Sequence, residues 1–327
     1  MKKIFITGGA GYVGAVLVPY LLDKGYTITT LDLMIYGEDV LKKHKNLKII
    51  KGDIRDKKLL EEVIPGHDTV IHLACISNDP SFELNPELGK SINYDAFLPL
   101  VEISKKSVKR FIFASSSSVY GIKKEQNVEE TMRLDPLTDY SKFKADCEKF
   151  LLKYKSDNFD TVILRPATVC GYSPRQRLDL VVNILTNLAY KKRNISVFGG
   201  DQLRPNIHIE DMVKAYEVLI EAEKSKVSGQ IFNVGYENQT VLQLAETVKR
   251  VIGDDVKLEK SKSDDNRSYH ISSKKIEKVL GFKTQKNIKD AVSDLKKAFE
   301  EGRLPNSLSE EKYFNIKKMQ SLKLKWK

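Results

Sequence analysis

Three residues of this chain have the types and spacing of a proton-transfer site. Tyr140 precedes Lys144 by four positions, and Ser116 lies upstream in the serine run 115–118. On a helix, positions i and i+4 share a face, so both side chains would point into one pocket. A lysine ammonium beside a phenol lowers the phenol pKa, which makes tyrosine usable as an acid or base near neutral pH. Taken alone, the spacing is weak evidence, and a solvated helix face explains it better.

A glycine-rich turn near the N-terminus indicates where a phosphate would bind. The apolar run 4–6 predicts a buried strand, and residues 15–22 are long enough for a helix that Pro19 would bend. Between the two stand three glycines spaced by three residues: Gly8, Gly11 and Gly14. Glycines allow a tight turn and close approach of the backbone to a pyrophosphate. The helix N-terminus adds free N–H groups and the positive end of its dipole.

An acidic residue follows the second predicted strand. This strand covers 26–31 and ends in Asp32, eighteen residues after Gly14. A carboxylate at this place accepts the hydroxyls of the adenosine ribose and repels a 2′-phosphate. The next three residues, 33–35, include no arginine that would receive such a phosphate. Strand, turn, helix and acid together predict NAD as the cofactor, in preference to NADP.

Strand and helix patterns alternate through the first two thirds of the chain. Strands are expected at 47–50, 68–74, 110–114 and 161–164, and helices up to Ile64, around 87–107 and from Tyr140 to about Tyr154. This alternation predicts an α/β fold with a doubly wound parallel sheet of the Rossmann type. Ligands of such sheets bind beyond the carboxyl ends of the strands. The segments of Ser116 and Tyr140 therefore belong to the edge where the cofactor would lie.

The pattern becomes looser after Pro166. Later helices are expected at about 210–223, 241–252, 274–280 and 287–300, and one more strand at 232–235. We expect residues 1–170 to form an NAD-binding Rossmann domain that also receives segments near 205–237. Residues 171–327 would form mostly a smaller C-terminal substrate-binding lobe, interleaved with the sheet and ending in a basic tail.

Composition limits the class of protein. The 327 residues are 41% hydrophobic and 30% charged, which is ordinary for a soluble globular chain. No apolar run approaches the ~18 residues needed to span a bilayer, so no membrane association is expected. Three cysteines, Cys75, Cys147 and Cys170, are too few and too scattered for a disulfide framework or a zinc site. The chain is therefore expected to be cytoplasmic and to carry no metal.

The net charge of +11 raises the question of a nucleic-acid partner. The lysines are dispersed, and residues 303–327 carry seven Lys/Arg against two Glu, a net of +5. Interleaved aromatic and basic blocks of the kind that stack RNA bases are missing from the sequence. The charge is better explained by a solvated basic surface that also draws in an anionic substrate, so no nucleic-acid partner is expected.

These residues together resemble the extended short-chain dehydrogenase/reductase family, in its NAD-dependent epimerase/dehydratase branch. The resemblance covers nearly the whole chain. The matching segments are the glycine turn 8–14, Asp32, 52–54, 72–74, Asn93, Ser116 with 119–121, Tyr140 and Lys144, 164–166, 197–204, 208–211, 232–235 and 278–282.

The family implies a role for each matching residue. Tyr140 is implied to be the catalytic base, with Ser116 as its partner and Lys144 holding the nicotinamide ribose. The residues implied to bind NAD are Gly8, Gly11, Tyr12, Val13, Gly14, Asp32, Asp53, Ile54, Leu73, Ala74, Asn93, Ser115, Tyr140, Lys144, Pro166 and Val169. Those expected to bind a nucleotide-diphosphate sugar are Ser77, Asn78, Ser116, Ser117, Arg175, Arg204 and Arg267. The planar fork of an arginine suits a diphosphate in geometry as well as charge.

Departures from the family pattern narrow the choice of reaction. In the 4,6-dehydratases, Asp-Glu follows the hydroxyl residue, but here Ser117 and Ser118 follow Ser116, which disfavours dehydration. Typical UDP-galactose 4-epimerases carry Tyr-Phe-Asn where this chain has residues 165–171, so galactose as the sugar is in doubt. The segments 77–81 and 173–179, which lie where the family binds the sugar, are also unusual. They suggest a less common hexose or heptose.

The resemblance supports one leading function and leaves others open. The leading hypothesis is an NAD-dependent nucleotide-sugar epimerase that works through a keto-sugar intermediate. A nucleotide-sugar dehydrogenase or 4-ketoreductase using the same Tyr140 is the alternative, and net NADH turnover distinguishes the two. A non-catalytic NAD-binding or RNA-binding relative is a further class, against which the intact set of Ser116, Tyr140 and Lys144 speaks. The family also implies a homodimer, paired through the helices around 87–107 and 138–154.

Overall fold

The computed structural model describes residues 2–125, 127–262, 268 and 270–322. At its centre lies a seven-stranded sheet in the order β10-β6-β5-β4-β1-β2-β3, in which every neighbouring pair is parallel. The strands are β1 Lys3–Thr7, β2 Thr27–Asp32, β3 Leu47–Lys51, β4 Thr69–His72, β5 Arg110–Ala114, β6 Asp160–Pro166 and β10 Gln230–Val234. The chain runs outward from β1 to β3 and then crosses to β4 on the other side of β1. The predicted doubly wound parallel sheet is thus confirmed, with its topological switch point between β1 and β4.

Two hydrophobic clusters cover the opposite faces of this sheet, because successive side chains along a strand point to opposite sides. In β1, Ile4 and Ile6 belong to the cluster that includes α1 and α8, whereas Phe5 belongs to the cluster of α2, α5 and α6. These three side chains are fully buried, as expected for a sheet covered on both faces. The helices are α1 Gly14–Asp23, α8 Ile209–Glu221, α2 Lys57–Val63, α5 Phe97–Lys105 and α6 Asp139–Leu152. Helix α1 continues through Pro19.

The single helix expected around 87–107 is divided in the structure. Helix α4 (Pro86–Lys90) passes into a π-helical turn at Ser91–Asp95, and α5 follows. A π-helical turn adds one residue to a helical turn and re-aims side chains, often near functional sites. Here it holds Asn93, whose side-chain amide bonds both the N–H and the carbonyl of Ile76 at 2.8 and 2.9 Å. A short helix, α3 (Asp79–Glu83), precedes α4.

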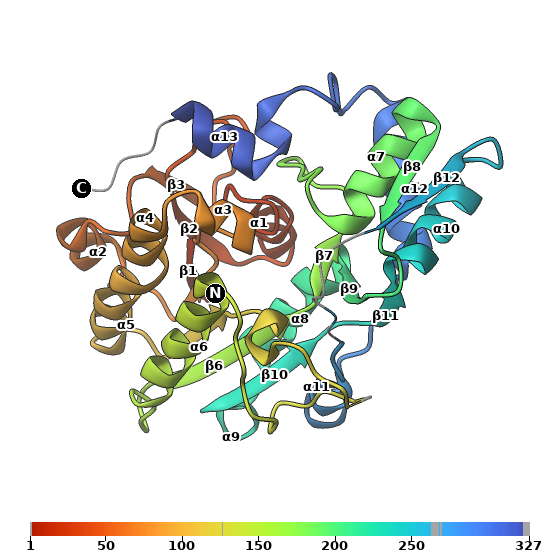
Figure 1. Ribbon diagram of the computed structural model, residues 1–327. Helices are drawn as coiled ribbons and strands as arrows, with labels where there is room; N and C mark the ends of the chain where they lie inside the picture. The colour runs from red at the N-terminus through yellow and green to blue at the C-terminus, as the bar shows by residue number, and fades with distance from the viewer. Residues whose placement is uncertain (1, 126, 263–267, 269, 323–327) are drawn as a thin grey trace.

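Two small sheets and three helices form a second lobe beside the main sheet (Figure 1). Strand β9 pairs with β7 in parallel and with β11 in antiparallel orientation, while β12 pairs in parallel with β8. Helices α7, α10 and α12 share a core of their own. The elements are β7 Thr168–Cys170, α7 Val181–Lys192, β8 Asn194–Phe198, β9 Leu203–His208, β11 Glu237–Thr240, α10 Val241–Ile252, β12 Lys257–Ser261 and α12 Ile288–Glu300. Between β9 and β11 the chain returns to the main sheet through α8 and β10, beside β6, where a further strand was expected.

The C-terminal segment leads from the second lobe back to the main sheet (Figure 1). A 3₁₀ turn at Glu311–Tyr313 precedes helix α13 (Asn315–Leu322), where the sequence indicated only a basic tail. Met319 of α13 joins the hydrophobic cluster that contains Phe82 and Ile92. The remaining short elements are α9 Lys224–Val227, α11 Lys274–Leu280 and a 3₁₀ turn at Ser117–Tyr120. Within the described ranges, every helix is too short or too polar to cross a bilayer.

Candidate active site

A cavity of about 350 Å³ lies beyond the carboxyl ends of the main-sheet strands. It gathers most of the residues that the sequence singled out, from eight separate segments of the chain. The sequence-predicted residues on its wall are Gly8, Gly11, Tyr12, Val13, Gly14, Asp32, Asp53, Ile54, Leu73, Ala74, Ser77, Asn78, Ser115, Ser116, Ser117, Tyr140, Lys144, Pro166, Val169 and Arg175.

The glycine turn has the shape of a phosphate cradle. Gly8 has φ +77°, and a Cβ there would lie 2.7 Å from the backbone nitrogen of Ala74. A Cβ on Gly14 would lie 2.5 Å from the carbonyl oxygen of Gly9, so the backbone itself demands glycine at both positions. Gly11 differs, because the nearest atom to its Cβ would be 3.1 Å away and the residue faces the cavity. A side chain at Gly11 would occupy space that a pyrophosphate needs, and these residues fit a dinucleotide.

Asp32 ends β2 and presents its carboxylate at the cavity wall. Its two oxygens accept hydrogen bonds from the backbone N–H groups of Ala10, at 2.9 Å, and Met34, at 2.8 Å. Burial raises the pKa of Asp32, while these two bonds act in the opposite direction. Each carboxylate oxygen retains acceptor capacity, so Asp32 fits a partner with two adjacent hydroxyls, such as a ribose.

Helix α6 carries Tyr140 and Lys144 into the cavity. A capping box fixes its start, since the Thr138 hydroxyl accepts from the N–H of Ser141 while the Ser141 hydroxyl accepts from the N–H of Thr138. The Lys144 ammonium donates to the carbonyl of Ala114 at 2.7 Å and lies 5.9 Å from the centre of the Tyr140 ring. Both side chains line the cavity, so the helix face that the spacing predicted is present.

The expected lowering of the Tyr140 pKa by Lys144 is wrong for this structure. Burial raises the pKa of Tyr140 well above its ordinary value, and the negative charge of Asp79 acts in the same direction. The positive charge of Arg177 and a hydrogen bond with Ser116 lower it. The cost of desolvating the phenolate outweighs the two contributions that lower the pKa. The Lys144 ammonium donates to the carbonyl of Ala114. In this state the phenol is protonated at neutral pH.

Arg177 is a site residue that the sequence did not identify. Its guanidinium pairs with Asp179 at 2.9 Å and donates to the hydroxyl of Ser77 at 3.2 Å. The side chain is 9% exposed and lines the cavity, where its charge acts on Tyr140. The segment 173–179 looked unusual in sequence, but only Arg175 was selected from it, because neither arginine has a local motif that distinguishes it.

Three further wall residues were also missed. Asp79 begins α3, accepts a hydrogen bond from the Thr138 hydroxyl, and lines the cavity near Tyr140. Tyr36 follows β2, and Asn315 begins α13. The unusual sequence of segment 77–81 could have indicated Asp79 as a site residue. Asn315 lies about 300 residues from the glycine turn, and no motif in the sequence indicates that it reaches the cavity.

Three predicted residues are not found on the cavity wall. The side-chain amide of Asn93, in the π-helical segment, bonds the backbone of Ile76 and so supports the 73–77 loop. Arg204 lies in β9, paired there with Gln239 of β11, and donates to the carbonyl of Leu203. Arg204 therefore belongs to the second lobe and is not among the described residues that line the cavity. Arg267 lies outside the described residues.

A buried ion pair links α6 to the main sheet. Arg165 and Glu148 have side chains 3% and 2% exposed, with 2.6 Å between Nη2 and Oε2. Glu148 also accepts a hydrogen bond from the Ser115 hydroxyl, and Arg165 donates to the hydroxyl of Tyr120 at 2.7 Å. Glu148 lies one helical turn after Lys144 in α6. The network therefore joins α6 to the ends of β5 and β6.

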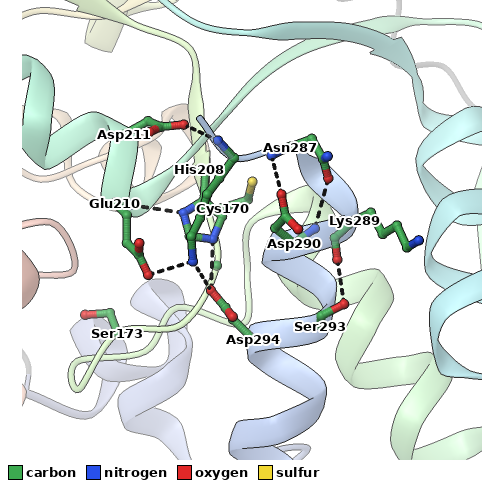
Figure 2. A network of polar contacts seen from close by, with 12 residues as sticks. Cys170, Ser173, His208, Glu210, Asp211, Asn287, Lys289, Asp290, Ser293 and Asp294 are labelled. Carbon is green, nitrogen blue, oxygen red and sulfur yellow. Dashed lines mark hydrogen bonds and ion pairs between the residues drawn. The ribbon is translucent and has the colours of Figure 1, made fainter. Parts of the chain in front are cut away.

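A second polar cluster lies away from the cavity. Figure 2 shows His208, Glu210 and Asp294 facing one another, a set that could in principle hold a metal ion. The Lys286 ammonium bonds both carboxylates, at 2.9 and 3.3 Å. The N–H of Glu210 donates to Nδ1 of His208, which leaves Nε2 protonated and donating to Asp294 at 3.1 Å. Because Lys286 and His208 already engage these carboxylates, we interpret this cluster as a connection between α8 and α12.

Comparisons with known proteins agree with this geometry. The model of the "NAD dependent epimerase/dehydratase family" matches residues 4–235. An uncharacterized UDP-glucose epimerase, YtcB of Bacillus subtilis (strain 168), is 33% identical over 77% of this chain and 82% of its own length. A UDP-glucose 4-epimerase of Lactobacillus helveticus is 26% identical over 89% and 95%. The crystal structure of the Thermotoga maritima UDP-glucose 4-epimerase with UDP-glucose superposes with a TM-score of 0.83, covering 92% of this chain and 99% of that one at 25% identity.

Proposed function

Because this chain belongs to the NAD dependent epimerase/dehydratase family, we propose that it is an NAD-dependent nucleotide-sugar epimerase. NAD is the cofactor of the family, and the glycine cradle and Asp32 fit it. The observation that carries the proposal is the meeting of Tyr140, Ser116 and Lys144 on one cavity wall. This set suits reversible proton transfer at a sugar hydroxyl.

In the proposed reaction, Tyr140 removes the proton of a sugar hydroxyl and Ser116 shares the proton path. NAD⁺ held by the glycine turn and Asp32 would supply a hydride acceptor and donor for the same carbon, and its positive charge would favour the phenolate. The keto sugar presents its other face before the hydride returns, and Tyr140 gives the proton back. The product differs from the substrate at one carbon, and no cofactor is consumed.

The residues around Tyr140 support redox chemistry without loss of water. Dehydration of a keto sugar needs an acid and a base near the leaving hydroxyl. Ser117 and Ser118 occupy the positions of that pair in the dehydratase pattern, and both line the cavity. The cavity does contain Asp79, but Thr138 bonds its carboxylate. We therefore propose an epimerase, not a dehydratase.

Several wider features belong to the same proposal. Residues 1–170, with the segments near 205–237, would bind NAD, and most of 171–327 would bind the nucleotide-diphosphate sugar. Ser77, Asn78 and Arg177 line the same cavity as Tyr140 and would bind the sugar. The protein would act as a cytoplasmic homodimer through the helices around 87–107 and 138–154, without a nucleic-acid or membrane partner. Light scattering of the purified protein tests the dimer.

A nucleotide-sugar dehydrogenase or 4-ketoreductase is the second candidate, since it would use Tyr140 in the same way. The two are separated by incubating purified protein with a panel of UDP-, dTDP- and GDP-sugars. Product stereochemistry is followed by NMR and NADH by its absorbance. An epimerase forms an epimer without net NADH, whereas a dehydrogenase accumulates NADH and a reductase consumes it. Absence of any product across the panel, with NAD bound, would favour a non-catalytic relative.

A further inference from the structure

Asn315 connects three distant segments of the chain at the cavity wall. The residue is buried, and its side-chain oxygen accepts from Arg175 Nη2 and from the Tyr36 hydroxyl, the latter at 3.0 Å. Its Nδ2 donates to the Ser77 hydroxyl, and its backbone N–H donates to Asp179, each at 3.0 Å. The first residue of α13 thus holds the segments that follow β2, β4 and β7.

The direction of these hydrogen bonds is fixed by the chemistry of the partners. A guanidinium only donates, so the Asn315 atom beside Arg175 is the oxygen, and the amide nitrogen faces Ser77. Arg177 Nη1 donates to the same Ser77 oxygen at 3.2 Å. The Ser77 hydroxyl therefore accepts from two groups that can only donate, and these occupy both of its lone pairs.

The hydroxyl hydrogen of Ser77 is left for another acceptor. Ser77 is half-buried and lines the cavity, and among the described residues only Asn315 and Arg177 bond its side chain. Because both lone pairs are engaged by the wall, the remaining O–H is available to a ligand in the cavity. Arg177, the second partner of Ser77, is close enough to Tyr140 for its charge to act on the phenol.

Asn315 holds its position because the chain is anchored on both sides of it. Tyr313 and Leu178 belong to one buried cluster, and the N–H of Leu178 donates to the carbonyl of Tyr313 at 2.9 Å. Met319, one turn further along α13, belongs to the cluster that contains Phe82 on one face of the main sheet. The C-terminal segment therefore presents Asn315 to the cavity wall from two fixed points.

We propose that Asn315 is a positioning residue that makes Ser77 a hydrogen-bond donor to an oxygen of the substrate's sugar. This inference rests on the nucleotide-sugar substrate of the proposed function. It separates two roles, because Ser77 contacts the sugar while Asn315 sets the direction in which Ser77 bonds. A sugar without an oxygen at that position would leave the donor unpaired, so the arrangement disfavours a deoxy sugar there.

The test compares variants of Asn315 and Ser77 with wild type by calorimetric titration. The probes are UDP-glucose, dTDP-glucose and GDP-mannose, each beside its nucleoside diphosphate. Asn315→Asp keeps the shape and gives Arg175 a carboxylate partner, but it replaces Nδ2 by an oxygen to which the Ser77 hydroxyl turns and donates. Asn315→Ala removes both groups, so the Ser77 hydroxyl turns freely. Ser77→Ala removes the donor itself.

The Kd for the nucleotide sugar that wild type binds best should rise by about three- to tenfold in Ser77→Ala and in Asn315→Asp, because one hydrogen bond is lost. Asn315→Ala should lose less, since Ser77 can still turn toward the sugar. Adding Ser77→Ala to Asn315→Asp should cause no further loss, because both changes remove the same bond. The Kd for the nucleoside diphosphate should stay unchanged in Ser77→Ala and in Asn315→Asp.

Ser307→Ala is the control for the C-terminal segment, because the buried Ser307 hydroxyl donates to the side-chain oxygen of Asn187 at 2.7 Å, outside the cavity. It should lower the ligand-free melting temperature and leave each Kd unchanged. A larger loss in Asn315→Ala than in Asn315→Asp or Ser77→Ala would overturn the inference, since Asn315 would then act by packing. Additive losses in the double variant, or an equal loss of nucleoside diphosphate binding, would also overturn it. If wild type bound none of the nucleotide sugars, the proposed function itself would fail, which is a separate result.

Discussion

The ammonium of Lys144 lies 2.7 Å from the carbonyl oxygen of Ala114, and this hydrogen bond joins helix α6 to the end of β5. An ammonium has three donors, so the bond leaves two for the cavity that Lys144 lines. The lysine therefore locates Tyr140 relative to the sheet. In the cofactor-free state, the balance of burial, Asp79, Arg177 and Ser116 sets the tyrosine's pKa.

Tyr140→Phe should abolish turnover and leave NAD bound. The phenyl ring keeps the packing of the cavity wall but cannot exchange a proton, and positioned acid–base catalysis contributes about 10²–10⁴ in rate. Turnover with the active nucleotide sugar and calorimetric titration with NAD measure the two effects separately. Activity near wild type in this variant would show that another group transfers the proton.

Asp79→Asn should move the acidic limb of the pH–rate profile to lower pH. The charge of Asp79 raises the pKa of Tyr140, so its removal lets the phenolate form at lower pH. The asparagine oxygen can still accept from Thr138, which preserves the start of α6. Ser116→Ala removes a bond that lowers the same pKa and should move the limb to higher pH. The measurement is kcat/KM as a function of pH for both variants. Acidic limbs that shift in the same direction, or do not shift, would show that Asp79 and Ser116 do not set the pKa of Tyr140 in this way.

Glu148→Gln should destabilise the fold by about 3–5 kcal/mol, because it leaves the buried Arg165 without its countercharge. Asp146→Asn on the same helix is the control. Its partner Lys149 is 69% exposed, and such surface pairs contribute about 0–1 kcal/mol. Urea unfolding gives both free energies. Equal losses in the two variants would mean that the Arg165–Glu148 pair does not act as a buried ion pair.

Stability should fall as the pH decreases below about 6.5, in part through His72. Burial lowers the pKa of His72 to about 3 from an ordinary 6.5, and the charge of Lys144 adds to this. The unfolded chain then binds a proton that the folded chain excludes, so the contribution is complete above 6.5 and is lost toward 3. The slope from one such group is at most about 1.4 kcal/mol per pH unit.

The variant His72→Phe isolates that contribution. His72 lies among Phe97 and Phe113, at 5.3 and 5.9 Å between ring centres, so a phenyl ring can pack there, at the loss of the 2.7 Å hydrogen bond between Thr7 and His72 at every pH. Urea unfolding between pH 6.5 and 4.5 should give a shallower slope than wild type. His67, whose pKa burial also lowers, remains in both proteins and sets the common background. Identical slopes would show that His72 does not titrate in this way.

Much of the fold could be read from the sequence because its signals are local. The glycine turn, Asp32 at the end of β2 and the helix 241–252 each depend on residues close together in the chain, and α10 spans Val241–Ile252. Patterns of this kind report which residues share a face or a turn. The helix expected around 87–107 was less well predicted, because a π-helical turn keeps the apolar pattern while it shifts the register.

The rest of the site depends on contacts between distant segments. The Tyr36 hydroxyl donates to the side-chain oxygen of Asn315. The basic C-terminal segment contains no motif that predicts this contact. The pKa of Tyr140 was predicted in the wrong direction because a spacing rule reports the nearby ammonium but not the burial that outweighs it. Arg204 was expected to bind the diphosphate, and this stays a prediction; its position in the fold is set by the pairing of β9 with β11, which the sequence did not indicate.

The central claim is that hydride leaves and returns to the same sugar carbon, with Tyr140 moving the proton. The most direct measurement uses the active nucleotide sugar with deuterium at every carbon-bound position of the sugar ring, followed by NMR. We predict an epimer that retains all of its deuterium at the original carbons, with no labelled NADH released. Loss of deuterium to solvent, its appearance in released NADH, or its transfer to another carbon with loss of water would contradict the epimerase mechanism.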